Sequence, residues 1–243
     1  MNRNAQFERI AALKASYEAA GHPVISVDTK KKELIGNLFR EGKIYTTETR
    51  EVFDHDFPSL AEGVAIPHAV YDLARHESYV SIGTSRETSE FACDALGQWW
   101  NDYGKVHYPH ARSILMLMDG GGSNSSRHYI FKQDIQALAD TIGIPIRIAH
   151  YPPYTSKWNP IEHRVFPHIT RSLQGVILTT HQLMKELIEK TTTRSGLKVV
   201  ACIINKVYKT GRKVAAEFKT SMRIIFDEQL GPWNYVAVPK KLI

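Results

Sequence analysis

The chain has 243 residues, of which 43% are hydrophobic and 23% charged, with a formal net charge of +6 and a pI of about 9.2. This is ordinary globular composition for one large domain or one domain with extensions, and a basic balance is compatible with a polyanionic partner. Cys93 and Cys202 lie far apart without CxxC spacing, which excludes a disulfide framework or a zinc cluster and fits a reducing compartment. The sequence shows neither a signal peptide nor an apolar run of about 18 residues, so we expect a soluble cytoplasmic protein without membrane contact.

The first third of the chain predicts a helix followed by several strands. Apolar residues recur at helical spacing near the start, namely Phe7, Ile10, Leu13 and Tyr17. The segment "VISVD", residues 24–28, predicts a short β-branched strand that ends on a carboxylate, and a second extended run follows it. Residues 41–62 show no period and predict a loop, whereas residues 63–85 predict two strands joined by a turn near residues 73–78.

The remainder alternates helices with strands. A helix capped near Thr88 or Ser89 is expected to direct Trp99 or Trp100 inward, and the apolar run 114–118 predicts a strand that stops at an aspartate and three glycines. Further on, the pattern predicts the following elements: a helix over 125–143, a strand from 144, a Pro-rich turn, a helix from about 160 to 173, then one helix and one strand before a basic, irregular tail. Early strands with short turns favour an antiparallel meander and later alternation favours parallel crossovers, so we predict a three-layer α/β fold with a mixed sheet.

Three acidic residues fall where such a fold could bring them together. Asp28 and Asp119 end two buried-type strands, and Glu162 lies in the first turn of a helix that follows the next strand. Like charges a few Å apart repel one another unless cations lie between them. Magnesium prefers such hard oxygen ligands, and two ions about 4 Å apart can stabilise an in-line phosphoryl displacement.

Each of these residues also has a simpler explanation. In "SKWNPIEHRVF", Asn159 suits the helix N-cap and Glu162 suits a capping box. Strand-end aspartates often cap turns, and the glycines after Asp119 are not followed by a GxxxxGK[ST] nucleotide loop. The order strand-Asp, strand-Asp, helix-Glu is what favours a metal site.

The motifs together resemble a known family. The segments that carry the resemblance are "VISVDTKKKELIGN", "HDFP", "VYDLA", "WW", "DGGGSN", "PPYTSKWNPIEHRVF" and "TTTRSGLKV". They are similar to bacterial insertion-sequence transposases of the DDE type, most closely the ISAzo-type group, which is related to the mariner-like transposases. The resemblance covers about residues 4–236 and implies an RNase H-like fold. It implies three parts: an N-terminal helix (1–22), a catalytic domain (23–178) and a C-terminal helix–strand extension (179–243).

Carried over by position, Asp28, Asp119 and Glu162 match the catalytic, metal-binding triad, and Asn159 is the expected support for Glu162. Asp72 in "VYDLA" also follows an apolar run and is the alternative first aspartate, although it lies near an expected hairpin turn. His55 and Asp56 in "HDFP" are candidates for a place near the site or for a structural turn. The resemblance implies two Mg²⁺ ions, with Mn²⁺ as a substitute.

The resemblance also implies DNA cleavage and strand transfer by a homo-oligomer in the bacterial cytoplasm, near the nucleoid. Phosphates are expected to contact Lys30, Lys31, Lys32, Lys157 and Arg164. A structure-specific nuclease of the same fold and an inactive DNA-binding remnant remain as alternatives. Because only 27 residues precede Asp28, we expect a catalytic portion that lacks the family's N-terminal helix-turn-helix reader of element ends.

Overall fold

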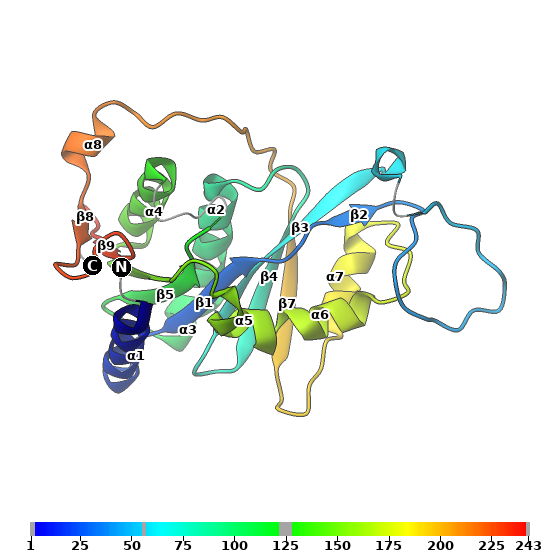
Figure 1. Cartoon of the computed structure of the whole chain (residues 1–243), viewed down its shortest axis with the longest axis horizontal. Coiled ribbons are helices and arrows are strands. Elements are labelled where there is room, and N and C mark those ends of the chain that lie inside the picture. Colours follow the sequence, from blue (N-terminus) through cyan, green and yellow to red (C-terminus); the bar gives the residue numbers. More distant parts are fainter. Residues whose placement is uncertain (1–2, 55–56, 122–127, 242–243) are drawn as a thin grey trace.

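The computed structural model describes residues 3–54, 57–121 and 128–241. Within these ranges one nine-stranded sheet forms, with strand order β7-β4-β3-β1-β5-β6-β9-β8 and with β2 paired to β3 (Figure 1). The strands are β1 (Val24–Thr29), β2 (Glu33–Ile35), β3 (Gly63–Asp72), β4 (Glu77–Gly83), β5 (Ile114–Asp119), β6 (Ile146–Tyr151), β7 (Lys198–Ile204), β8 (Ile224–Phe226) and β9 (Asn234–Ala237). The helices are α1 (Arg3–Ala19), α2 (Ser89–Trp99), α3 (Lys105–His107), α4 (Tyr129–Ile142), α5 (Pro160–Arg164), α6 (Phe166–Leu173), α7 (His181–Glu189) and α8 (Phe218–Ser221).

The sheet is mixed, as the strand and turn pattern predicted. Strand β1 pairs antiparallel with β3, which pairs antiparallel with β4 through a tight connection. On its other side β1 pairs parallel with β5, and β5 pairs parallel with β6. Strand β1 therefore lies centrally, at the junction between the antiparallel and parallel halves.

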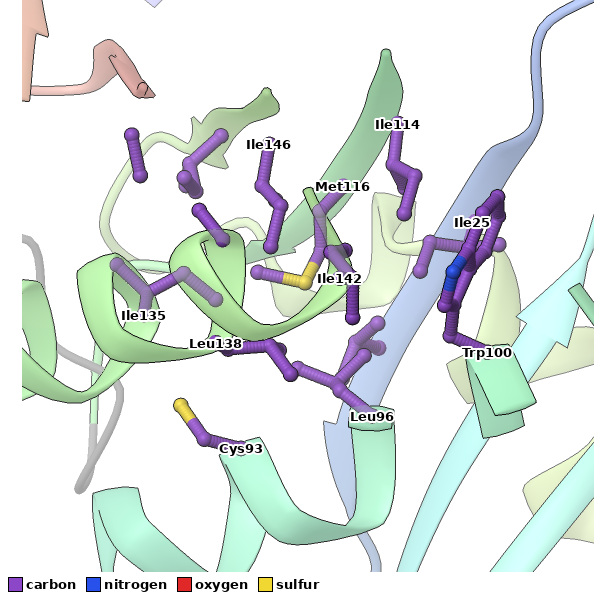
Figure 2. Close-up of a cluster of buried hydrophobic side chains, with 14 of the residues drawn as sticks. Ile25, Cys93, Leu96, Trp100, Ile114, Met116, Ile135, Leu138, Ile142 and Ile146 are labelled. Carbon is purple, nitrogen blue, oxygen red and sulfur yellow. The ribbon is translucent and has the colours of Figure 1, made fainter. Parts of the chain in front are cut away.

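Alternate residues of the central strands face opposite layers. Ile25 and Val27 of β1 pack with Met116 and Met118 of β5 against helices α2 and α4, and Figure 2 shows part of this cluster around Ile25 and Met116. The π-helical turn Trp100–Gly104 extends α2, and both Trp99 and Trp100 are buried in this core, as expected. A second core packs β3 and β4 against α5, α6 and α7, and a third packs α1 on β1, β5 and β6. The predicted three-layer α/β architecture is confirmed.

The helix predicted over residues 160–173 is in fact two helices. Val165 has φ −125° and ψ −59°, and α5 ends before it while α6 begins after it. Pro167 lies in the first turn of α6, and because proline has no N–H it cannot donate a bond back to α5. The break lets α5 cross β1 while α6 runs on toward α7.

The tail after residue 204 is more regular than its composition indicated. Strands β8 and β9 lie in it, and β9 pairs antiparallel with β6. The residues after 178 thus supply strands at both ends of the sheet, with β7 beside β4. Among the described helices, none is long and apolar enough to cross a membrane.

Candidate active site

Two strand ends bring Asp28 and Asp119 to the same edge of the sheet. In the parallel β1–β5 pair, Val27 lies opposite Met118, so the aspartate that follows each of them comes next in register. Side chains alternate along a strand. Because Val27 and Met118 face helices α2 and α4, both aspartates face the opposite layer, which contains α1 and α5.

Helix α5 carries Glu162 across this edge. The carboxyl groups of Asp28 and Glu162 lie within hydrogen-bonding reach, and both Asp119 and Glu162 act on Asp28 as nearby charges. Burial, the Asp119 charge and the bond with Glu162 together raise the pKa of Asp28 to about 8. Burial and the charge of Glu162 raise the pKa of Asp119 to about 6. The structure therefore brings the three acidic residues together at a mutual electrostatic cost.

These residues fit a divalent cation. The Oδ1 atom of Asp119 is buried, and within the described part of the chain it has no hydrogen-bond partner. Asp28 and Asp119 line a cavity of about 400 Å³. Among the described residues, no three His, Cys, Asp or Glu side chains are arranged so that they could hold a metal ion. The donor chemistry nevertheless suits one, because an orphaned oxygen among repelling carboxylates is what a hard cation would satisfy.

Asn159 and Ser26 form a hydrogen-bond network behind the carboxylates. The Ser26 hydroxyl accepts the backbone N–H of Ile161 at 3.0 Å and donates to Asn159 Oδ1 at 2.5 Å. Since a hydroxyl has a single proton, this arrangement turns the Asn159 NH₂ group away from Ser26. That NH₂ group reaches the Val27 carbonyl at 3.4 Å, and its bond to Asp119 lowers the pKa of that carboxyl.

The capping interpretation of "NPIE" is therefore wrong for the side chains. Asn159 occupies the N-cap position of α5 but its side chain makes no cap bond, and Ser26 of β1 instead accepts the N–H of Ile161. Asn159 is fully buried; its side-chain amide interacts with Asp119, whereas its backbone carbonyl accepts the N–H of Glu162 at 3.0 Å. The sequence indicated Asn159 as a supporting residue but gave no signal for Ser26.

His150 fixes the end of β5 from the other side. Its Nδ1 lies 3.0 Å from the backbone oxygen of Asp119, and its Nε2 lies 3.1 Å from the Tyr235 hydroxyl. A carbonyl can only accept, so Nδ1 carries the proton and Nε2 accepts from Tyr235. Burial lowers the pKa of His150 to about 4, which keeps the ring neutral in this role.

Asp72 lies away from the cluster. It pairs with Ile25 in the antiparallel β1–β3 register, three residues from the position of Asp28 and about 10 Å along the strand. Its carboxylate accepts bonds from the Tyr108 hydroxyl and from the backbone N–H groups of Ala74 and Arg75. Asp72 therefore holds the turn after β3, which favours Asp28 as the first aspartate.

The predicted phosphate contacts divide into two groups. Lys30 is buried and its ammonium forms an ion pair with Glu33 at 2.5 Å, which argues against a contact with phosphate. Lys31, Lys157 and Arg164 are exposed. Lys32 is also exposed and lies 3.5 Å from Glu87.

Several residues of the cavity were not predicted. Its wall includes Glu87, from the connection between β4 and α2, and Tyr154 from the turn after β6. Neither residue belongs to a periodic pattern, so only the folded chain brings them to Asp28. His55 and Asp56, like most of the "GGGSN" segment, lie outside the described residues.

We expect the stability of the metal-free protein to fall as pH rises between about 4 and 8. The pKa of Asp28 is raised from 3.8 to about 8, so the folded state holds a proton that the unfolded chain releases. The free energy of unfolding then decreases with pH. Urea denaturation with EDTA should show this decrease in the wild type relative to Asp28→Asn. Parallel pH profiles for the two proteins would contradict it.

Comparison with known proteins agrees with this geometry. The family described as Rhodopirellula transposase DDE domain matches residues 1–239. A search of curated proteins found no match. The Mos1 transposase paired-end complex with left transposon end is similar, with a TM-score of 0.50 and 13% identity over 77% of this chain and 52% of that chain.

Two further solved structures show weaker similarity. The Mos1 mariner paired end complex with Mn gives a TM-score of 0.48 and 12% identity over 77% of this chain and 53% of the other. The human cytomegalovirus terminase nuclease domain gives a TM-score of 0.28 and 9% identity over 79% of this chain and 69% of the other. The chain thus spans about half the length of the Mos1 chains that it matches. With its sheet, its layers and a family match over residues 1–239, the chain has an RNase H-like fold and belongs to the Rhodopirellula transposase DDE domain family.

Proposed function

We propose that this chain is the catalytic domain of a DDE transposase, which cuts DNA at an element's ends and joins the freed 3′ hydroxyl to target DNA. The observation that supports this most strongly is the interaction of Asp28, Asp119 and Glu162, which come from three separate elements, beside a cavity that Asp28 and Asp119 line. Family membership agrees with it. The residues 23–178 contain all three groups and are the proposed catalytic core.

Asp28, Asp119 and Glu162 would hold divalent cations, and we propose two Mg²⁺ ions that Mn²⁺ can replace. When bound, such ions neutralise charge on the phosphate and activate the attacking water or hydroxyl. The protein's part is to position ligands: the Asn159 amide orients Asp119, and Ser26 holds helix α5 against β1. Neither cysteine supplies a nucleophile at this cavity, because Cys93 is buried on α2 within the core and Cys202 packs against that core.

The direct test is a cleavage and strand-transfer assay with an element-end duplex, a target duplex and Mg²⁺. Joined product that disappears in Asp28→Asn supports a transposase. Cutting of branched or flapped DNA without joining would instead identify a structure-specific nuclease. Binding without metal-dependent cutting would identify an inactive remnant. We propose that the active form is a homo-oligomer on DNA, which sedimentation of the protein–DNA complex would show as more than one protein copy.

Exposed basic residues predict DNA binding that weakens with salt. Replacing Lys31, Lys157 and Arg164 together by glutamine should lower the slope of log affinity against log salt by roughly one unit for each lost phosphate contact. Fluorescence anisotropy with a duplex between about 50 and 200 mM salt measures this slope. Lys198→Gln is the control, because Lys198 is exposed at the start of the edge strand β7, where it pairs with Glu77 of β4. Equal slopes for the triple variant and the control would contradict the proposed contacts.

A further inference from the structure

Tyr154 has an unfavourable conformation that its own packing does not explain. Its φ is 64°, in the left-handed region that bulky residues avoid, and its side chain is 95% exposed. Within the described part of the chain, its hydroxyl makes no hydrogen bond that would offset this strain. Strained residues of this kind concentrate at functional sites.

The turn that presents Tyr154 is firmly anchored. The Thr155 hydroxyl donates to the Pro152 carbonyl at 2.6 Å, and the Trp158 N–H donates to the Thr155 carbonyl at 2.9 Å. The Trp158 ring packs edge-on against Phe7 of α1, with centroids 6.0 Å apart. The backbone of Tyr154 is therefore held in place by the turn.

That place is the rim of the candidate active site. Tyr154 lines the same cavity as Asp28 and Asp119. Trp158 is 57% exposed four residues later, and the Lys157 ammonium lies 5.7 Å from its ring. An exposed aromatic face beside carboxylates and a cation suits a nucleotide, whose base stacks while its phosphates meet the charges.

We propose that Tyr154 is a stacking platform for an unpaired nucleobase next to the scissile phosphate. This inference rests on the proposed function, since it needs DNA at the carboxylates. A paired base is covered on both faces by its neighbours, so stacking on Tyr154 requires a base that is frayed, flipped out or single-stranded. The left-handed backbone of Tyr154 leaves the ring exposed at the cavity wall.

The test uses a single-stranded oligonucleotide with one 2-aminopurine, whose fluorescence falls when an aromatic ring stacks on it. The full chain carrying Asp119→Asn prevents cleavage during the titration. We expect quenching in this background, binding about tenfold weaker with Tyr154→Ala, and nearly unchanged binding with Tyr154→Phe, which keeps the ring.

Tyr154→Gly separates a binding role from a structural one. Glycine tolerates φ 64° without strain, so the melting temperature should stay equal or rise while binding falls about tenfold. Leu230→Gly is the matched control, because Leu230 has φ 59° and is absent from the cavity wall. It should relieve similar strain and leave quenching unchanged.

The inference would be overturned by Tyr154→Ala binding as well as the parent, by Tyr154→Phe losing binding, or by Tyr154→Ala weakening a fully paired duplex as much as the single strand. A change of oligomeric state without a change in quenching would assign Tyr154 to a protein interface and also overturn it. Tyr154-dependent quenching in a chain that never cuts DNA would support stacking while the proposed function fails. If the wild type and Tyr154→Ala cleave DNA equally well and quenching does not depend on Tyr154, the stacking inference fails while the proposed function stands.

Discussion

Glu162→Gln should lower metal-dependent DNA cleavage by about a thousandfold or more, because it removes one charged ligand from the proposed ion site. The amide has nearly the same shape as the carboxylate. Folding should be almost unaffected, since the Glu162 backbone N–H bonds to the Asn159 carbonyl and this bond does not involve the side chain. Loss of one repelling charge near Asp28 should stabilise the metal-free protein.

Cleavage of a labelled duplex at saturating Mg²⁺, together with urea denaturation, measures both effects. Glu186→Gln is the matched control, because Glu186 is an exposed glutamate on α7 whose side chain contacts Gln182. The control should retain activity. Cleavage by Glu162→Gln within about tenfold of the wild type would remove Glu162 from the metal site and leave it a surface residue of α5.

Ser26→Ala should lower both stability and activity. The change leaves the Ile161 N–H and Asn159 Oδ1 buried without their partner, which costs about 1–3 kcal/mol for such a group. It also frees the Asn159 amide to rotate, so that an oxygen can face Asp119. By analogy with groups that orient metal ligands, we expect divalent-cation affinity or activity to fall about 10–100-fold.

Ser78→Ala is the control for losing a buried hydroxyl, because the Ser78 Oγ is buried and has no hydrogen-bond partner in the described structure. Ser26→Thr keeps the hydroxyl, so it should restore divalent-cation affinity. It should restore stability less, since its extra methyl crowds a fully buried position. Isothermal titration with Mn²⁺ measures the cation affinity separately from the stability. An unchanged Mn²⁺ affinity in Ser26→Ala would contradict the proposed role of the network.

Much of the fold followed from local pattern. The strand-end positions of Asp28 and Asp119 were visible because apolar runs stop there, and the switch from short turns to helical crossovers indicated where the sheet changes from antiparallel to parallel. Strands β8 and β9 were missed because they are short and lie in a basic tail, and their pairing with β6 depends on contacts distant in sequence.

The candidate site was predictable to a smaller extent. Sequence order distinguished Asp28 from Asp72 only through an expected hairpin, whereas the antiparallel register places them about 10 Å apart. A charge run such as the one around Lys30 looks solvated in sequence, and only folding reveals the pairing of Lys30 with Glu33. Ser26 and Tyr154 carried no signal, since one acts through a residue 133 positions away and the other through its backbone conformation.

A crystal structure of the full chain with Mn²⁺, read from anomalous scattering, tests the central claim most directly. The account predicts a Mn²⁺ peak about 2.1 Å from oxygens of Asp28 and Asp119, with Glu162 completing the site and Asp72 uninvolved. Mn²⁺ bound elsewhere, or carboxyl groups of the three residues more than about 10 Å apart, would contradict it, because a two-metal site cannot span that distance.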